Sequence, residues 1–223
     1  SALVQAETEL KHYDKALAAA SRLEQLQPKS AQPLNLKASV YLAQGDRASA
    51  RTALEKAIAL EPTFFPAVTA LVRLDLADKN MAAAKKRFDA VLAKDAKNFG
   101  AMAGLAELAL LENKPDEATR LLEKAQAENP DAIPAVLKLG GHYLLTKQND
   151  KALKLARNQQ AAHPTNADML DLLGQAQIAN KDAGGALETY SKLVNVLPKS
   201  AMAQMRLAQA HVLLKNDTAA AED

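Results

Sequence analysis

A repeat of 34 residues constrains this chain more than any other feature of its sequence. Alanine recurs at that spacing seven times, at Ala16, Ala50, Ala84, Ala118, Ala152, Ala186 and Ala220. A proline series keeps the same spacing with one gap, at Pro28, Pro62, Pro130, Pro164 and Pro198. Two series with one period indicate a tandem array in which each unit contacts mainly its neighbours.

The residues between these markers favour two helices in each unit and no strands. Hydrophobic residues make up 48% of the chain but aromatic residues only 4%, so the apolar content is mostly the strong helix formers Ala and Leu. Side chains that cap helix N-termini precede the expected first helices at Ser30, Asn98, Asn166 and Ser200, and the second helices at Asp46, Asn80 and Asp182. We expect the first and last units to be incomplete.

Packing and turn geometry explain two of the periodic positions. The repeated alanine is expected where the helices of a pair cross, since a larger side chain there would overpack by roughly 1–3 kcal/mol. The turn between the two helices falls at Gly45, and the same place holds Lys79, Asn113, Lys147, Lys181 and Lys215 in other units, where the lysines would act on the negative end of the helix dipole.

This pattern resembles the tetratricopeptide repeat. Laid on the sequence, that family's frame gives units 31–64, 65–98, 99–132, 133–166 and 167–200, with partial units 1–30 and 201–223. Its small first-helix residue falls on Ala38, Val72, Ala106, Gly140, Gly174 and Ala208, and the preceding leucine on Leu71, Leu105, Leu139, Leu173 and Leu207. Lys37 departs from the leucine pattern. Aromatic positions of the family are filled at Tyr41, Tyr143, Phe88 and Tyr190, whereas Asp75, Ala109 and Gln177 replace them.

The resemblance implies an all-α, right-handed superhelix of helix–turn–helix units, forming one array over residues 1–223. The sequence begins inside an expected first helix and stops early in an expected second helix. Neither end shows the polar helix that usually closes such arrays. We therefore expect a piece of a longer array, with self-association through the ends as the alternative.

No residue pattern predicts catalysis, a metal site or a cofactor. His12, His142, His163 and His211 have no neighbouring ligands on one helix face and are expected to lie scattered on the surface or in a groove. Two carboxylate pairs lie one helical turn apart, Asp75 with Asp78 and Asp168 with Asp171. We interpret both as capping groups or a solvated face.

Charge gives no sign of a nucleic-acid or membrane partner. The chain has 28 basic and 26 acidic residues, a net charge of +2, and no apolar run long enough for a membrane span. The basic run 85–87 is expected on an outer helix face in water, with binding to nucleic acid or acidic lipid as the alternative. Phe64 and Phe65 are expected in the core between repeats, with an exposed partner anchor as the alternative. Cysteine is absent, so disulfides and thiolate metal sites are excluded.

The concave face of first helices is where the family binds polypeptides. By resemblance, the groove positions fall on Asn35, Ser39, Thr69, Arg73, Ala103, Glu107, Leu137, Gly141, Asp171 and Gln175. None of these pairs matches the Lys and Asn with which some members clamp a terminal carboxylate. Small residues at Gly100, Ala103, Gly104 and Gly141 would let a partner backbone approach, or would only permit tight packing between repeats. We predict a protein or peptide partner, while a groove that binds nothing stays open.

A second resemblance concerns the role of the chain. Segments 65–75 and 103–109 are similar to the repeat lipoproteins of bacterial exosortase (PEP-CTERM) loci, which accompany exopolysaccharide export and surface-protein sorting. This similarity implies a scaffold at the cell envelope, on the periplasmic side, with its lipidated cysteine outside this sequence. The alternative is a cytoplasmic adaptor or regulator that binds a peptide. A helical-repeat RNA binder is disfavoured because Glu107 and Asp171 oppose the single cation Arg73 in the groove.

Overall fold

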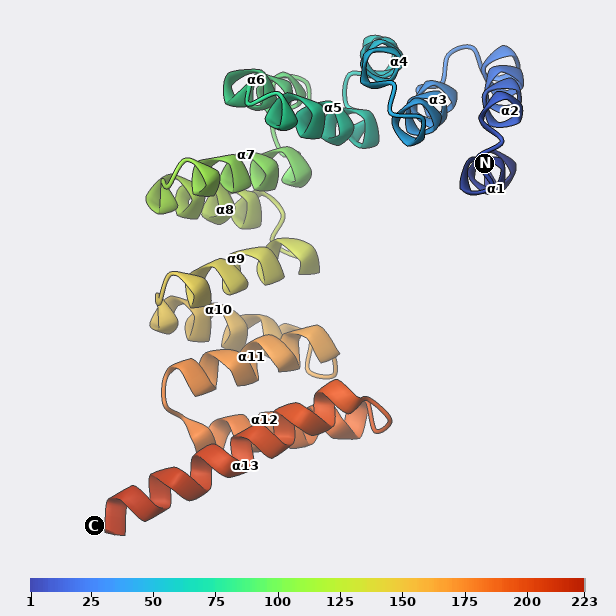
Figure 1. Ribbon diagram of the computed structural model, residues 1–223. Helices are drawn as coiled ribbons and strands as arrows, with labels where there is room; N and C mark the ends of the chain where they lie inside the picture. The colour runs from blue at the N-terminus through green and yellow to red at the C-terminus, as the bar shows by residue number, and fades with distance from the viewer. Residues whose placement is uncertain (223) are drawn as a thin grey trace. The chain divides into compact units, whose positions relative to one another are not determined.

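The computed structural model describes residues 1–222, with side chains described through Lys215. Every regular element in this part of the chain is an α-helix (Figure 1). The helices are α1 (Ala2–Glu9), α2 (Tyr13–Leu26), α3 (Gln32–Ala43), α4 (Arg47–Leu60), α5 (Phe65–Ala77), α6 (Met81–Leu92), α7 (Phe99–Leu111), α8 (Pro115–Glu128), α9 (Ile133–Leu145), α10 (Asn149–Ala162), α11 (Ala167–Ala179), α12 (Ala183–Val196) and α13 (Ala201–Glu222). The all-α tandem-repeat fold is therefore confirmed.

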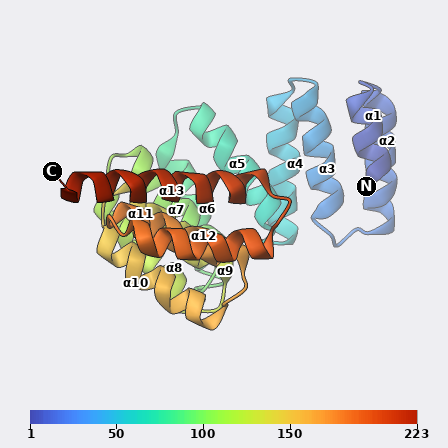
Figure 2. The same cartoon turned by 90° about the horizontal axis from the view of Figure 1, so that it is seen from below.

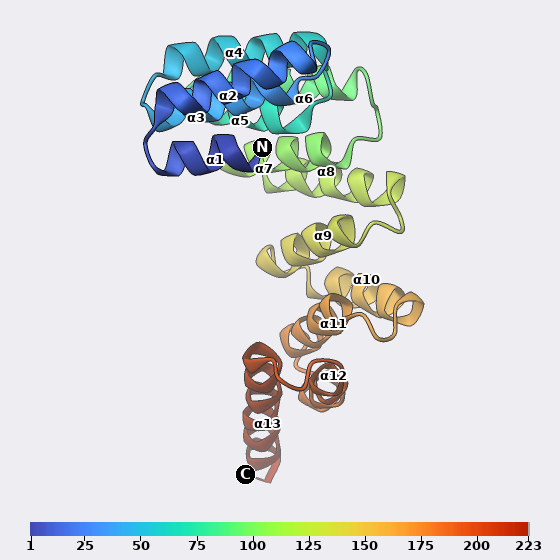
Figure 3. The same cartoon turned by 90° about the vertical axis from the view of Figure 1, so that its right-hand side faces the viewer.

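The chain forms two compact units, residues 1–108 and the part that begins at Ala109. In the first unit, α1 packs on α2, α3 on α4 and α5 on α6; α3 and α4 lie side by side in Figure 2. In the second unit, helices α8 to α13 pack each on the next, and the two first helices α9 and α11 also contact one another (Figure 3). Each unit is thus a stack of helix pairs.

The turns inside the pairs share one backbone conformation at the 34-residue spacing. A left-handed residue closes each of them, with φ of 59° at Lys11, 82° at Gly45, 58° at Lys79, Asn113 and Lys147, and 62° at Lys181. Five of the predicted turn positions are confirmed, at Gly45, Lys79, Asn113, Lys147 and Lys181, and the lysines there form the turn with their backbone. Only glycine adopts this conformation without steric cost, so the other five are held by the packing of the helices they join.

The last turn position behaves differently from the prediction. The frame places a turn at Lys215 and a second helix after it, but α13 continues from Ala201 to Glu222. The segment after Lys215 contains no glycine or proline, and residues 219–221 are alanines. The alanines favour helix, and no glycine or proline ends α13 at the turn position.

The periodic alanines lie at the helix crossings, as predicted. Ala16, Ala50, Ala84, Ala118, Ala152 and Ala186 are each 0% exposed, while the side chain of Ala220 lies outside the described residues. The small first-helix residue is buried at Ala38, Val72, Ala106, Gly140 and Gly174. Ala208 is exposed, contrary to the prediction, because no second helix of its own repeat covers α13 in the described residues.

All but one of the predicted N-cap residues cap their helices. Side-chain oxygens of Asp46, Asn80, Asn98, Asn166, Asp182 and Ser200 each accept a hydrogen bond from the backbone N–H three residues later, at 2.8–3.3 Å. Ser30 is the exception, since α3 begins after Ala31. Its hydroxyl accepts from the N–H of Gln32 at 3.3 Å, and the N–H of Ala31 donates to Glu61 Oε1 at 2.6 Å instead.

Two of the glycines predicted to admit a partner backbone are packing positions. An added Cβ at Gly100 would lie 2.6 Å from the ring of Phe65, and one at Gly104 would overlap the ring of Phe88. The two ring centroids lie 6.1 Å apart with the ring planes tilted by 31°, and the half-buried Phe65 packs between repeats, as predicted. Bulky rings occupy the space that these glycines leave, so only Gly141, which has no atom within 4 Å of an added Cβ, keeps the predicted open surface.

The neighbouring glycines of α9 should respond oppositely to alanine. Gly141→Ala should stabilise the protein by about 0.5–1 kcal/mol, because alanine restricts the unfolded chain and meets no obstacle. Gly140→Ala should cancel or reverse that gain, because its Cβ would lie 2.7 Å from Leu172 Cδ2. Urea unfolding of the two variants provides the test, and an equal gain in both would show that Leu172 does not limit the space at residue 140.

Candidate functional site

The predicted groove residues of the first unit include one exposed cation without a partner. On α5, Arg73 is exposed between buried neighbours on both sides, and it forms no ion pair with any described residue. Glu107 is likewise exposed on α7, while Ala103 is only 8% exposed and belongs to the core. Arg73 and Glu107 hold the same position in successive repeats, so this position is solvent-facing in both.

The other groove residues of the first unit satisfy their hydroxyl groups locally. Ser39 donates to the carbonyl of Asn35 at 3.0 Å, and Thr69 donates to the carbonyls of Phe65 and Pro66 at 3.1 and 3.0 Å. Asn35 and Thr69 are half-buried and Ser39 is exposed. These side chains line the helices without forming a cluster that could hold an ion.

In the second unit, two of the predicted groove residues lie half-buried on α9, and a third forms an ion pair. Leu137 and Gly141 are half-buried on α9. Asp171 on α11 accepts from Gln175 Nε2 at 2.6 Å and from Arg206 Nε at 2.9 Å. The carboxylate of Asp171 is therefore used to join α11 to α13, which the prediction of a free groove acid did not anticipate.

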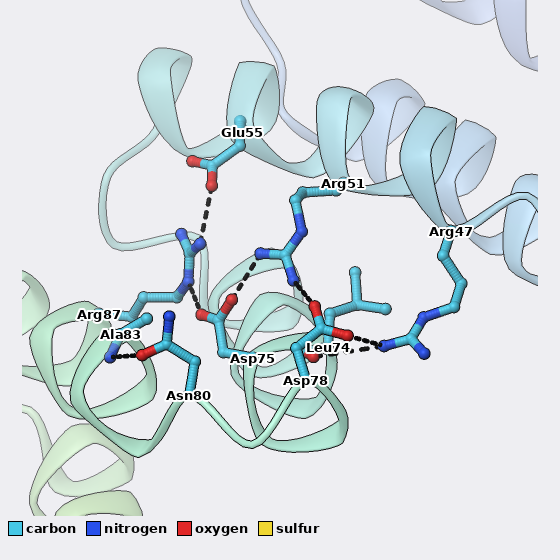
Figure 4. Close-up of polar contacts among 9 residues, drawn as sticks. All are labelled: Arg47, Arg51, Glu55, Leu74, Asp75, Asp78, Asn80, Ala83 and Arg87. Carbon is cyan, nitrogen blue, oxygen red and sulfur yellow. Dashed lines mark hydrogen bonds and ion pairs between the residues drawn. The ribbon is translucent and has the colours of Figure 1, made fainter.

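A buried ion network joins three helices of the first unit (Figure 4). The carboxylate of Asp75, only 4% exposed, accepts from Arg51 Nη1 of α4 at 2.5 Å and from Arg87 Nε of α6. Arg87 also donates to Glu55 at 2.8 Å. Burial raises the pKa of Asp75, but the hydrogen bonds and charges of the two arginines outweigh it and hold the pKa below the ordinary value. Asp75 is thus ionised in the core.

The edge of this network continues towards solvent. Asp78 accepts from Arg47 Nη2 at 2.7 Å and from Arg51 Nη2 at 2.8 Å, and its side chain is 49% exposed. As Figure 4 shows, Arg47, Arg51 and Glu55 lie along one side of α4 at intervals of one turn. The network fixes α4 against α5 and α6, and we assign it a structural role.

These contacts correct two predictions. Asp75 was expected on a solvated face, and Arg87 on an outer face in water, but Asp75 is buried and the Arg87 side chain is only 16% exposed. The reason is that Asp75 occupies a position that faces the neighbouring helices, where Tyr41 and Tyr143 stand in other repeats. Lys85 and Lys86 of the same basic run are exposed, as predicted.

His142 is also placed differently from the prediction. The side chain was expected on a surface, yet it is 4% exposed on α9 and its Nε2 lies 2.7 Å from the hydroxyl of Thr119 on α8. Burial lowers the pKa of His142 by disfavouring the charged imidazolium. His142 and Thr119 thus form a buried contact between α8 and α9. Among the described residues, no three His, Asp or Glu side chains come together to hold a metal ion.

Acid should therefore destabilise the second unit through His142. Because its pKa is lower in the folded state than the ordinary 6.5, the unfolded state binds the proton more readily as pH falls below that value. The free energy of unfolding should decline from about pH 6.5 downward. The decline should be smaller in His142→Gln, which cannot titrate. Urea unfolding at a series of pH values tests this, and parallel curves for the two proteins would contradict it.

Family models match nearly the whole chain. One tetratricopeptide repeat model matches residues 41–109, 75–140 and 109–176, and a second matches residues 2–63 and 172–223. No curated protein matches the sequence. No helix of the described residues is long and apolar enough to cross a membrane.

Solved structures with the same fold share little sequence identity. The type IV pilus biogenesis factor PilW is 20% identical with a TM-score of 0.63, over 92% of this chain and 95% of that one. A tetratricopeptide repeat protein of Thermus thermophilus is 22% identical with a TM-score of 0.56, over 82% and 100%. YrrB, whose structure has an unusual peptide-binding site, is 19% identical with a TM-score of 0.53, over 84% and 96%.

A fourth match involves a longer protein. In the APC/C hetero-tetramer Cut9–Hcn1, the matching chain is 16% identical with a TM-score of 0.56, and this chain spans 40% of its length. Three observations indicate the same repeat. They are the helix pairs, the buried alanines at the 34-residue spacing, and the family models. The chain belongs to the tetratricopeptide repeat family.

Proposed function

We propose that this protein is a non-catalytic scaffold that binds a polypeptide along the exposed face of its first helices. Its fold supports protein–protein interaction in general, as in other members of the family. The observation that carries the proposal is Arg73, which is exposed on an otherwise buried stretch of α5 and has no partner among the described residues. The carboxylates closest to it in sequence, Asp75 and Asp78, are already paired with other arginines.

Each unit has its own exposed first-helix features. Arg73 supplies a charge that can fix the direction of a bound chain through a hydrogen bond to a carbonyl or carboxylate. On α9, Gly141 leaves the helix backbone open, and the half-buried Leu137 offers apolar surface beside it. These features suit an extended peptide better than a small molecule.

The test uses the intact protein as bait in a lysate of the source organism, followed by affinity measurement with the segment so identified. Arg73→Glu and Gly141→Arg should each weaken binding tenfold or more, because one removes a charged contact and the other blocks the open helix face. Lys94→Glu, an equal charge change on an exposed residue after α6, should leave the affinity within about twofold. Unchanged binding by both folded groove variants would contradict the proposal.

The finer proposal places this scaffold in a bacterial cell-envelope assembly for exopolysaccharide export or protein sorting. Its support is the resemblance of segments 65–75 and 103–109 to repeat lipoproteins of exosortase loci. The full-length gene should then encode a lipoprotein signal ahead of this sequence. A full-length gene without such a signal, and a protein recovered from the cytoplasm, would favour a cytoplasmic adaptor instead.

A further inference from the structure

Three hollows beside second helices recur at the 34-residue spacing. One of about 320 Å³ lies between α2, α3 and α4, one of about 410 Å³ between α4, α5 and α6, and one of about 370 Å³ along α8. Their linings correspond position by position. Ser49, Ala83 and Glu117 share one repeat position, as do Thr52, Lys86 and Arg120, and likewise Lys56, Ala90 and Lys124. The hollow is therefore a property of the repeat, and it lies apart from the predicted groove residues.

The hollow between α4, α5 and α6 is the apolar member of the series. Its walls include Ile58 of α4, the buried Val68 of α5, and Ala83 and Ala90 of α6. Pro62, Lys86 and Arg87 complete the lining. Figure 4 shows the guanidinium of Arg87 held between Asp75 and Glu55. Two ion pairs therefore fix Arg87, the longer of the two basic side chains that line the hollow, while Lys86 is exposed at its rim.

The rim of this hollow carries a cation with no partner. Lys86 is exposed and pairs with none of the described residues, whereas the charge of Arg87 is balanced by Asp75 and Glu55. The corresponding rims also carry cations, at Lys56 in the preceding hollow and at Arg120 and Lys124 along α8. Two acids line these other hollows, but Glu24 is paired with Lys37 at 2.5 Å, and Glu117 also has a partner.

We propose that the α4–α6 hollow is a second docking site, which takes an acidic polypeptide segment with one large apolar side chain. The apolar side chain fills the space between Ile58, Val68 and Ala90, and a carboxylate on the same segment pairs with Lys86. The argument for an acidic partner is charge complementarity, since the unpaired charge at this rim is positive. The site is independent of the first-helix face proposed above.

The test measures binding of a fluorescein-labelled synthetic peptide in which one phenylalanine is flanked by glutamates. Fluorescence anisotropy gives the affinity, and amide NMR shifts of the full chain locate the peptide. Lys86→Glu and Ala90→Glu should each weaken binding at least fivefold, and Lys94→Glu should stay within twofold. Both changed residues are exposed, so circular dichroism should show an intact fold. The amides of α6 should shift most, and a peptide with glutamine in place of glutamate should bind at least fivefold more weakly.

Each other outcome overturns the proposal. Equal losses in Lys86→Glu and Lys94→Glu would indicate nonspecific charge attraction, and equal affinity for the glutamine peptide would remove the role of the carboxylate. Absence of saturation at about 1 mM peptide would show that the hollow does not bind this chemistry. If Arg73→Glu abolished binding while Lys86→Glu did not, the peptide would occupy the first-helix face. The proposed function would then stand, and this second site would not.

Discussion

Asp75→Ala should destabilise the first unit by about 3 kcal/mol, the largest effect expected of any single substitution considered in this protein. Removing one partner of a buried ion pair typically costs about 3–5 kcal/mol, because the remaining charge stays away from water without compensation. The low end applies because the Arg51 side chain is 32% exposed and can recover some hydration. Urea unfolding followed by far-UV circular dichroism measures the change in unfolding free energy.

The outer member of the same network is the matched control. Asp78 is 49% exposed, so Asp78→Ala should cost at most about 1 kcal/mol. The double variant Asp75→Tyr with Arg87→Leu installs the residues that stand at 143 and 155 two repeats later. It should recover at least half of the stability lost in Asp75→Ala. Equal effects of Asp75→Ala and Asp78→Ala would contradict a structural role for the buried carboxylate.

The second large effect is expected at the periodic alanines. Ala118→Phe and Ala152→Phe should each destabilise the protein by roughly 1–3 kcal/mol, because both methyl groups are 0% exposed and a ring would force α8 or α10 away from its partner. For a chain of this size, each kcal/mol corresponds to a shift in melting temperature of roughly 2–4 °C. Thermal unfolding of the purified variants provides the measurement.

A control for this prediction lies on α8 itself. Ala127 is exposed, so Ala127→Phe should shift the melting temperature much less than Ala118→Phe. The two variants carry the same substitution on the same helix, and they differ only in whether the substituted residue is buried or exposed. Similar melting temperatures for the two variants would mean that the 34-residue frame does not mark the helix crossings.

The repeat frame predicted what depends on local sequence. The alanine spacing located the helix crossings, and the polar residues before each helix located most N-caps, because caps and turns involve residues at most a few positions apart. The frame also placed the turns, although the left-handed backbone of four lysines and an asparagine was not anticipated. Those residues adopt it because the flanking helices pack around a fixed turn.

The buried polar pairs could not be predicted from spacing along one helix. Asp75 and Asp78 look like a solvated pair in sequence, and only packing brings Arg51 and Arg87 to Asp75 from other helices. Comparison of equivalent positions between repeats does indicate that Asp75 is buried. Asp75 stands where Tyr41 and Tyr143 stand, and a charge at a core position requires an opposite charge nearby.

Comparison between repeats likewise indicates that His142 is buried. Its position holds Val40, Leu74 and Leu108 in the three preceding repeats, and all three are buried. Reading positions across repeats would therefore have placed the imidazole in the core and suggested a hydrogen-bonding partner such as Thr119. The candidate groove was less predictable, because small residues serve packing at Gly100 and Gly104 but exposure at Gly141, and only the surrounding side chains distinguish the two.

Site-specific photo-crosslinking tests the proposed scaffold most directly. A photoreactive phenylalanine derivative is placed at residue 73 or 141 on the first helices, or at the exposed residue 127 on α8, and the intact protein is irradiated in a lysate of the source organism. The account predicts that positions 73 and 141 each capture a polypeptide, identified by mass spectrometry, and that position 127 does not. Capture of no polypeptide from residues 73 and 141, or equal capture from all three positions, would contradict binding along the first-helix face.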